Sequence, residues 1–162
     1  MSVIQENRAP SLPMGQFAVL RTSGHLRTLL GSCLGLALYD RRVKVAALGH
    51  IVLPDSQGRG DPPGKYADTA VPAMIRHMQK MAEDETLKLA AKIAGGANMF
   101  VGNDARNTIG VQNIEAVERI LEGLRIPIIG RHCGGEQGRR MQLDAATGAV
   151  TIDIVGAASM TI

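Results

Sequence analysis

Short, mostly apolar runs separated by polar turn residues fill the chain between residues 17 and 53, and residues 34–39 alternate with a period of two. These runs predict short β-strands at residues 17–20, 26–30, 34–39 and 44–53. A segment rich in Pro, Gly and Asp, residues 54–65, follows and is predicted to be a loop. Residues 1–14 are polar and include two prolines, so we predict a flexible N-terminal arm there and one folded domain over residues 15–162.

The spacing of apolar positions becomes helical after residue 66. Apolar residues at 70, 71, 74, 75, 78 and 81 share one face, which predicts a helix that begins between residues 68 and 71, so that Pro72 falls in its first turn. A second helix is predicted over residues 113–124, with Asn113 as its N-cap. Further strands are predicted at residues 87–93, 126–129, 140–143 and 149–155, the last two forming a hairpin.

About eight short strands and two helices, connected mostly as hairpins, predict an α+β fold with the helices packed on a largely antiparallel sheet. A doubly wound parallel fold would need more crossover helices. The 162 residues, 45% of them hydrophobic, suffice for one globular domain with its own core.

The amino-acid composition argues against several classes of function. Aromatic residues make up 2% of the chain and the net charge is +3, which argues against a nucleic-acid partner. The N-terminus has no continuous apolar run, and no segment approaches the roughly 20 apolar residues of a membrane span, so we expect neither a signal peptide nor membrane insertion. Two cysteines do not make a disulfide scaffold, and we predict a reduced, cytoplasmic protein.

Cys33 and His50 are the main candidates for chemistry. The strands before and after residues 40–43 should be antiparallel neighbours, which places Cys33 opposite approximately His50. A thiol beside an imidazole is the arrangement of a cysteine nucleophile and its base. Two alternatives remain at this stage: Cys33 is an inert packing residue, or Cys33 and His50 bind zinc together with His132 and Cys133, although the spacing of these four is not typical of a zinc site.

Three glycine-containing segments are predicted to surround this pair. Gly31 and Ser32 precede Cys33, where backbone N–H groups can approach an oxyanion. The segments AGGAN (94–98) and CGGEQGRR (133–140) are predicted to form tight turns beside the site. Arg139 and Arg140 are predicted to be a surface pair. The residues that we assign to substrate binding are Gly31, Ser32, Asn98, Gly134 and Gly135.

Several longer segments resemble the CheD family of chemoreceptor glutamine deamidases. They are LLGSCLGLALYD (29–40), ALGHIVLPDS (47–56), GKYADTAVPAMIRHM (64–78), AKIAGGANMF (91–100), IGVQNIEAV (109–117), CGGEQGRR (133–140) and TGAV (147–150). The resemblance spans roughly residues 15 to 155. It implies an α/β sandwich similar to the deamidating toxins of the cytotoxic necrotising factor type.

The resemblance also implies an activity. It predicts hydrolysis of glutamine side chains on methyl-accepting chemotaxis receptors to glutamate and ammonia, through a thioester on Cys33 with His50 as general base, and without a metal or organic cofactor. The implied partners are the cytoplasmic helices of the receptors and, in some organisms, the phosphatase CheC. The alternative is a regulatory adaptor, with weak or no catalysis, that binds receptors or CheC through the same pocket.

The third catalytic residue is ambiguous in this sequence. The family commonly has a threonine six positions before the nucleophile, where this chain has Arg27, and Thr28 follows it. In a strand, a shift of one residue turns a side chain to the opposite face. Either Thr28 reaches His50 through a local bulge, or the third member is absent.

Overall fold

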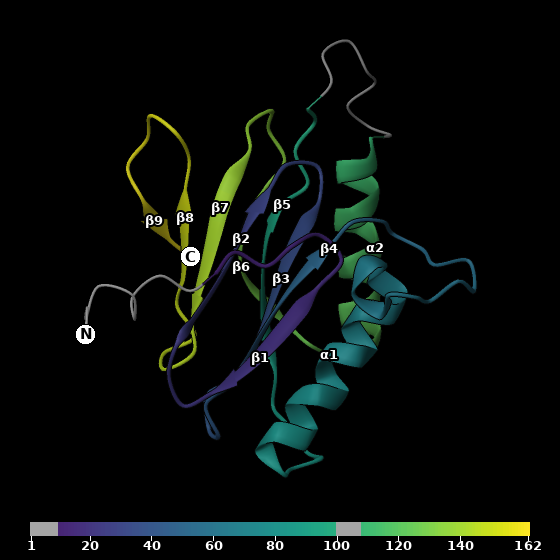
Figure 1. Ribbon diagram of the computed structural model, residues 1–162, viewed down its shortest axis with the longest axis vertical. Coiled ribbons are helices and arrows are strands. Elements are labelled where there is room, and N and C mark those ends of the chain that lie inside the picture. Colours follow the sequence, from purple (N-terminus) through teal and green to yellow (C-terminus); the bar gives the residue numbers. More distant parts are fainter. Residues whose placement is uncertain (1–9, 100–107) are drawn as a thin grey trace.

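Two β-sheets lie face to face, and two helices cover the outer face of the larger sheet (Figure 1). The computed structural model describes residues 10–99 and 108–162. The larger sheet has the strand order β1 (Phe17–Arg21), β4 (Val45–Ile51), β3 (Leu34–Asp40), β5 (Ala90–Gly95), β6 (Ile128–Cys133). The smaller sheet has the order β2 (His25–Leu30), β7 (Arg139–Asp144), β8 (Val150–Asp153), β9 (Met160–Thr161). The helices are α1 (Ala67–Ala82) and α2 (Ile109–Gly123), and a short 3-10 helix, Pro63–Lys65, precedes α1.

The prediction of an α+β fold with mostly antiparallel strands and two main helices is confirmed. Strands β5 and β6 pair in parallel, because α2 connects them as a crossover, and the other neighbours within the two sheets pair antiparallel. The similarity to the necrotising-factor toxins stays a prediction. None of the helices within the described ranges is long and apolar enough to cross a membrane.

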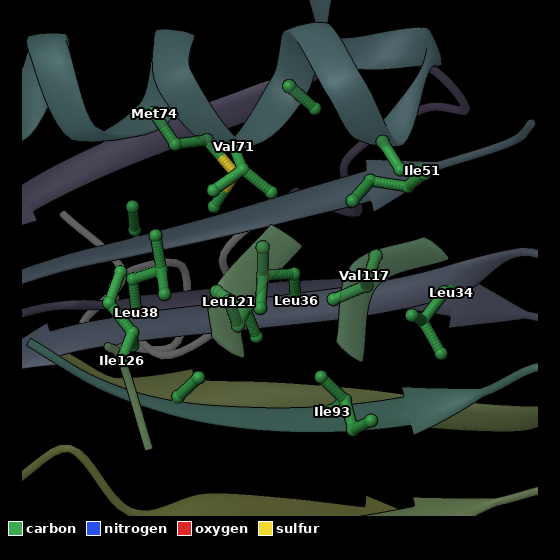
Figure 2. Packing of buried hydrophobic residues seen from close by; sticks show 14 of the residues in the cluster. Leu34, Leu36, Leu38, Ile51, Val71, Met74, Ile93, Val117, Leu121 and Ile126 are labelled. Atoms are coloured by element: carbon green, nitrogen blue, oxygen red, sulfur yellow. The ribbon is translucent and has the colours of Figure 1, made fainter. Parts of the chain in front are cut away.

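Strand β3 is buried on both faces, and this places it at the centre of the molecule. Its even-numbered leucines point toward the helices and pack with residues of α1 and α2, as Figure 2 shows for Leu34, Leu36, Leu38, Val71, Met74, Val117 and Leu121. Its opposite face packs against the smaller sheet in a second cluster that includes Leu30, Cys33, Ala37, Leu48 and Met141. Residues at the end of β3 are therefore held between two cores.

The two helices begin earlier than predicted. Helix α1 begins at Ala67, so Pro72 lies in its second turn and leaves the carbonyl of Asp68 without its usual helical donor. Helix α2 begins at Ile109, and its N-cap is Thr108, whose hydroxyl accepts a hydrogen bond from the N–H of Val111 at 3.3 Å. Asn113 is therefore not a cap but a buried residue inside the helix.

Candidate active site

The hydroxyl of Thr28 on β2 contacts the ring of His50 on β4, and this contact joins the two sheets. Thr28 Oγ1 and His50 Nδ1 are 2.6 Å apart, and the two residues are 0% and 3% exposed. The Thr28 hydroxyl also donates a hydrogen bond to the carbonyl of Leu12 at 2.8 Å. Leu12, Thr28 and His50 thus form a continuous hydrogen-bonded chain between the sheets.

These two hydrogen bonds determine which ring nitrogen of His50 carries its hydrogen. A hydroxyl has one hydrogen, and that of Thr28 points to Leu12, so its oxygen must accept from Nδ1–H. Nε2 then carries the lone pair. Nε2 is buried, and within residues 10–99 and 108–162 nothing hydrogen-bonds to it. The site therefore presents an oriented base with no partner of its own.

The backbone around residues 12–16 holds His50 in place. The N–H of Leu12 donates to the carbonyl of Arg27 at 2.8 Å, the N–H of Gly15 donates to the carbonyl of His50 at 2.9 Å, and the N–H of His50 donates to the carbonyl of Gln16 at 2.9 Å. Leu12 falls within the segment predicted to be a flexible arm, of which residues 1–9 lie outside the described ranges. The boundary at residue 14 stays a prediction, but Leu12 belongs to the site.

Cys33 lies directly before β3 and faces the smaller sheet. The ladder pairs Gly35, not Cys33, with His50, so the predicted register is wrong by two residues. The cause is the turn, which begins one residue later than predicted because the Asp40 carboxylate accepts hydrogen bonds from the N–H groups of Arg42 and Val43 at 2.8 and 3.4 Å. A shift of two preserves the face of the strand, so the side chains of Cys33 and His50 still point to the same side.

The protonation of both groups is governed by burial. Burial raises the pKa of the Cys33 thiol above its ordinary value. Burial also lowers the pKa of His50, an effect that the Leu12 carbonyl opposes. Both shifts favour a neutral thiol beside a neutral imidazole over a thiolate–imidazolium pair. Cys33 and His50 are not hydrogen-bonded to each other in this structure.

Thr28, rather than Arg27, points toward His50. The alternation along β2 buries Leu26, Thr28 and Leu30 on one side and turns Arg27 to the other. The pairing of β2 with β7 is regular, so no bulge is involved. Neither of the two alternatives from the sequence is found. Residues 31–33 form a bend that carries the chain from β2 in the smaller sheet to β3 in the larger one, and Thr28 reaches His50 from the inner face of a regular β2.

The predicted glycine segments do converge on Cys33 through backbone hydrogen bonds. The N–H groups of Gly96 and Ala97 donate to the carbonyls of Cys33 and Gly31 at 2.9 and 3.0 Å. The N–H of Asn98 donates to the carbonyl of Gly135 at 2.8 Å. The N–H of Gly134 donates to the carbonyl of Gly95 at 2.9 Å, and the carbonyl of Ser32 accepts from the side chain of Asn113 at 3.2 Å. The assignment of Gly31, Ser32, Asn98, Gly134 and Gly135 to substrate binding stays a prediction.

Arg139 is not a surface residue as predicted. It is 4% exposed, because Arg139, Met141 and Leu143 alternate on the inner face of β7. Its guanidinium donates to the carbonyl of His132 at 2.6 Å and also to the carbonyl of Gly134. The period-two pattern of β7, extended by one step, would have identified it. Arg139 therefore fixes the turn that carries Gly134 and Gly135.

The zinc alternative finds no support in the geometry. Among the described residues, no three His, Cys, Asp or Glu side chains lie close enough to hold a metal ion. His132 Nδ1 instead contacts the Arg139 guanidinium at 2.8 Å. A cavity of about 470 Å³ opens at the far end of β3, beside Tyr39 and Lys92, and none of the predicted site residues lines it.

The fold and the site define a class of protein: an α+β sandwich in which a thiol, an imidazole and a hydroxyl lie buried between two sheets. Comparison with known proteins identifies the family. Residues 52–154 match the family described as CheD chemotactic sensory transduction. This chain belongs to the CheD family.

Individual relatives are similar over nearly their whole length. A probable chemoreceptor glutamine deamidase CheD of Clostridium botulinum is 45% identical over 158 residues, which cover 93% of this chain and 96% of that protein. The chemoreceptor glutamine deamidase CheD of Thermotoga maritima is 40% identical over 144 residues, covering 88% and 90%. A probable enzyme of the same name from Methanococcus vannielii is 41% identical over 140 residues, covering 86% and 90%.

Proposed function

We propose that this protein is a protein-glutamine deamidase that converts glutamine side chains of methyl-accepting chemotaxis receptors to glutamate and releases ammonia. The observation that carries the proposal is the buried Nε2 of His50, which has no partner among the described residues and is oriented by Thr28 on the same side of the sandwich as Cys33. The names of the relatives supply the substrate class. The proposed substrates lie on the cytoplasmic helices of the receptors, so we place the protein in the cytoplasm.

The proposed mechanism is covalent. As the Cys33 sulfur attacks the carboxamide carbon of the glutamine, His50 Nε2 accepts the thiol proton. Backbone N–H groups, including that of Cys33, stabilise the tetrahedral oxyanion. The imidazolium returns the proton to the leaving nitrogen, and ammonia departs to leave a thioester. His50 then deprotonates a water molecule, which hydrolyses the thioester to glutamate and frees Cys33.

The pKa shifts suit this sequence of steps. Because burial raises the pKa of Cys33 and lowers that of His50, the resting pair is neutral. The proton therefore moves as the sulfur attacks rather than beforehand. A neutral resting thiol also reacts slowly with electrophiles other than a bound substrate, since the thiolate is the nucleophilic form.

The direct test uses a purified cytoplasmic fragment of a receptor. Incubation with the protein should release ammonia and increase the mass of the fragment by the difference between an amide and an acid. A matched fragment in which the modified glutamines are replaced by glutamate should give neither signal. Binding of the fragment without any product would instead support the alternative, an adaptor for receptors or for the phosphatase CheC.

Replacing Thr28 tests the orientation of the base. Thr28→Val removes the hydroxyl that accepts the Nδ1–H of His50, at a cost of about 1–3 kcal/mol, and should lower kcat about 10- to 100-fold. Thr28→Ser keeps a hydroxyl and should stay within about 3-fold of the wild type. Steady-state kinetics on the receptor fragment measure both. Equal rates for the valine and serine variants would show that the hydroxyl has no part in the reaction.

A further inference from the structure

Asn113 connects the two backbone segments on which Cys33 and His50 lie. It is 0% exposed, and it lies on the first half of α2. Its side-chain Nδ2 donates to the carbonyl of Ser32 at 3.2 Å and to the carbonyl of Val52 at 3.0 Å. Ser32 directly precedes Cys33, and Val52 lies two residues after His50.

The contact of Asn113 lies where the hydrogen-bonded ladder between β3 and β4 ends. The antiparallel ladder between β3 and β4 ends at the pair Leu34 and Ile51. The next pair would be Cys33 and Val52, but β3 begins at Leu34, so Cys33 lies outside the ladder. At this point the amide of Asn113 bonds to both backbone segments, and these side-chain hydrogen bonds replace the backbone hydrogen bonds of the ladder, which ends one residue earlier. The spacing between the Cys33 and His50 segments thus depends on a side chain from α2.

The orientation of the Asn113 amide follows from its partners. Both neighbours are carbonyl oxygens, which only accept hydrogen bonds, so the NH2 group must face them. Its oxygen Oδ1 is left buried and without a partner among the described residues. An apolar side chain would remove this unpaired acceptor, but it would leave the carbonyls of Ser32 and Val52 without the donor that Asn113 supplies. The asparagine therefore satisfies the two backbone segments beside Cys33 and His50 at the cost of its own oxygen.

Close packing of glycines lets α2 approach the site. A Cβ on Gly110 would overlap the carbonyl of Gly96, and a Cβ on Gly96 would come within 2.6 Å of the side chain of Ile114. The N–H of Gly96 in turn donates to the carbonyl of Cys33 at 2.9 Å. The start of α2 and the turn after β5 therefore support the Cys33 segment together.

We propose that Asn113 is a positioning residue that sets the distance and direction between the Cys33 thiol and Nε2 of His50. This inference deepens the proposed deamidase function and rests on it. It assigns Asn113 no contact with substrate. Loss of its two hydrogen bonds should leave substrate binding unchanged and impair the steps in which His50 exchanges protons with Cys33 and the leaving nitrogen.

The test compares Asn113→Ala and Asn113→Leu with Glu115→Ala, a change at an exposed position of the same helix. All are made in a Cys133→Ala background, so that Cys33 is the one remaining cysteine. The leucine variant approximately keeps the volume of the side chain, so it separates the loss of hydrogen bonds from the loss of packing. It also gives a second variant to measure if Asn113→Ala does not fold. Two properties are measured: kcat and KM on the receptor fragment, and the pH dependence of Cys33 alkylation by iodoacetamide.

We expect both Asn113 variants to lose about 10- to 100-fold in kcat, because a misplacement of about 1 Å costs that much, with little change in KM. Their alkylation profiles should shift from that of the Glu115→Ala control, since the influence of His50 on the Cys33 thiol depends on their separation. Variants that melt at lower temperature but keep the kcat and alkylation profile of the control would overturn the proposal and leave Asn113 a purely structural residue.

The alkylation measurement keeps the two proposals distinguishable, because it needs no receptor and no turnover. If the wild type releases no ammonia, the deamidase proposal fails, while a shifted profile still supports positioning by Asn113. If the wild type is active and the variants match the control in both measurements, the positioning proposal alone fails. Gly110→Ala, which must push α2 away from Gly96, should reproduce the shift of the Asn113 variants.

Discussion

Replacing Cys33 by alanine is expected to lower the rate of glutamine deamidation by at least about 10⁴-fold, to the level of the uncatalysed reaction in a bound complex. The proposed thioester needs a sulfur at this position, and a methyl group cannot replace it. Because Cys33 is 9% exposed and lies in a mixed cluster of aliphatic side chains, the smaller alanine should leave a minor cavity and a folded protein. The measurement is ammonia release and mass increase on the receptor fragment.

The second cysteine provides the matched control. Cys133 lies at the end of β6, and burial raises the pKa of its thiol as it does for Cys33. Cys133→Ala should therefore remove a second, partly buried thiol and keep activity within about 3-fold of the wild type. A Cys33→Ala protein that binds the fragment and deamidates it at the wild-type rate would exclude covalent catalysis by Cys33.

Replacing His50 by glutamine is expected to lower kcat by about 10³-fold, because general base and general acid catalysis by one residue contributes about 10² to 10⁴. Glutamine can keep a hydrogen bond to Thr28 but has no basic nitrogen. His77→Gln, on the exposed face of α1, is the matched control and should be indistinguishable from the wild type. A His50→Gln protein with wild-type kcat would show that another group accepts the thiol proton.

His50 is also expected to determine how kcat/KM depends on pH on the acidic side. Protonation of Nε2 removes the acceptor for the thiol proton, so activity should fall as the pH drops through the pKa of His50. Burial lowers that pKa, so the decline in kcat/KM should be centred below the ordinary histidine value of about 6.5. Measurements of kcat/KM from neutral to acidic pH test this. A decline centred above that value would indicate a stabilised imidazolium and would contradict the neutral resting pair.

Local sequence patterns are sufficient to predict most of the helices and strands and the two candidate catalytic residues, Cys33 and His50. Period-two alternation predicts β3 and β8, helical spacing predicts α1 and most of α2, and a thiol and an imidazole on neighbouring antiparallel strands predict the pair Cys33 and His50. Each of these signals lies within a short segment of chain. They depend on the geometry of one strand, helix or hairpin, so they are largely independent of how the rest of the chain folds.

The errors arose where the contacts of a particular side chain, rather than the periodicity of the segment, determine the structure. The pairing of Gly35 with His50 depends on the hydrogen bonds of Asp40 in the turn, which alternation does not report. Asn113 resembles a helix cap in sequence, but Thr108 caps α2, and Asn113 contacts Ser32 and Val52 from inside the helix. The charge of Arg139 predicts a surface position, but the alternation of β7 places it on the inner face of the strand.

By itself, then, the sequence determined the α+β class, the two helices and the candidate pair Cys33 and His50, because these depend on patterns within short segments. Only the tertiary structure decided that Thr28 and not Arg27 reaches His50, and that the Leu12 carbonyl sets the ring nitrogen that carries the lone pair. The reason is physical. Thr28 and His50 lie on different sheets, and which side chains meet between two stacked sheets is set by the packing of both sheets at once.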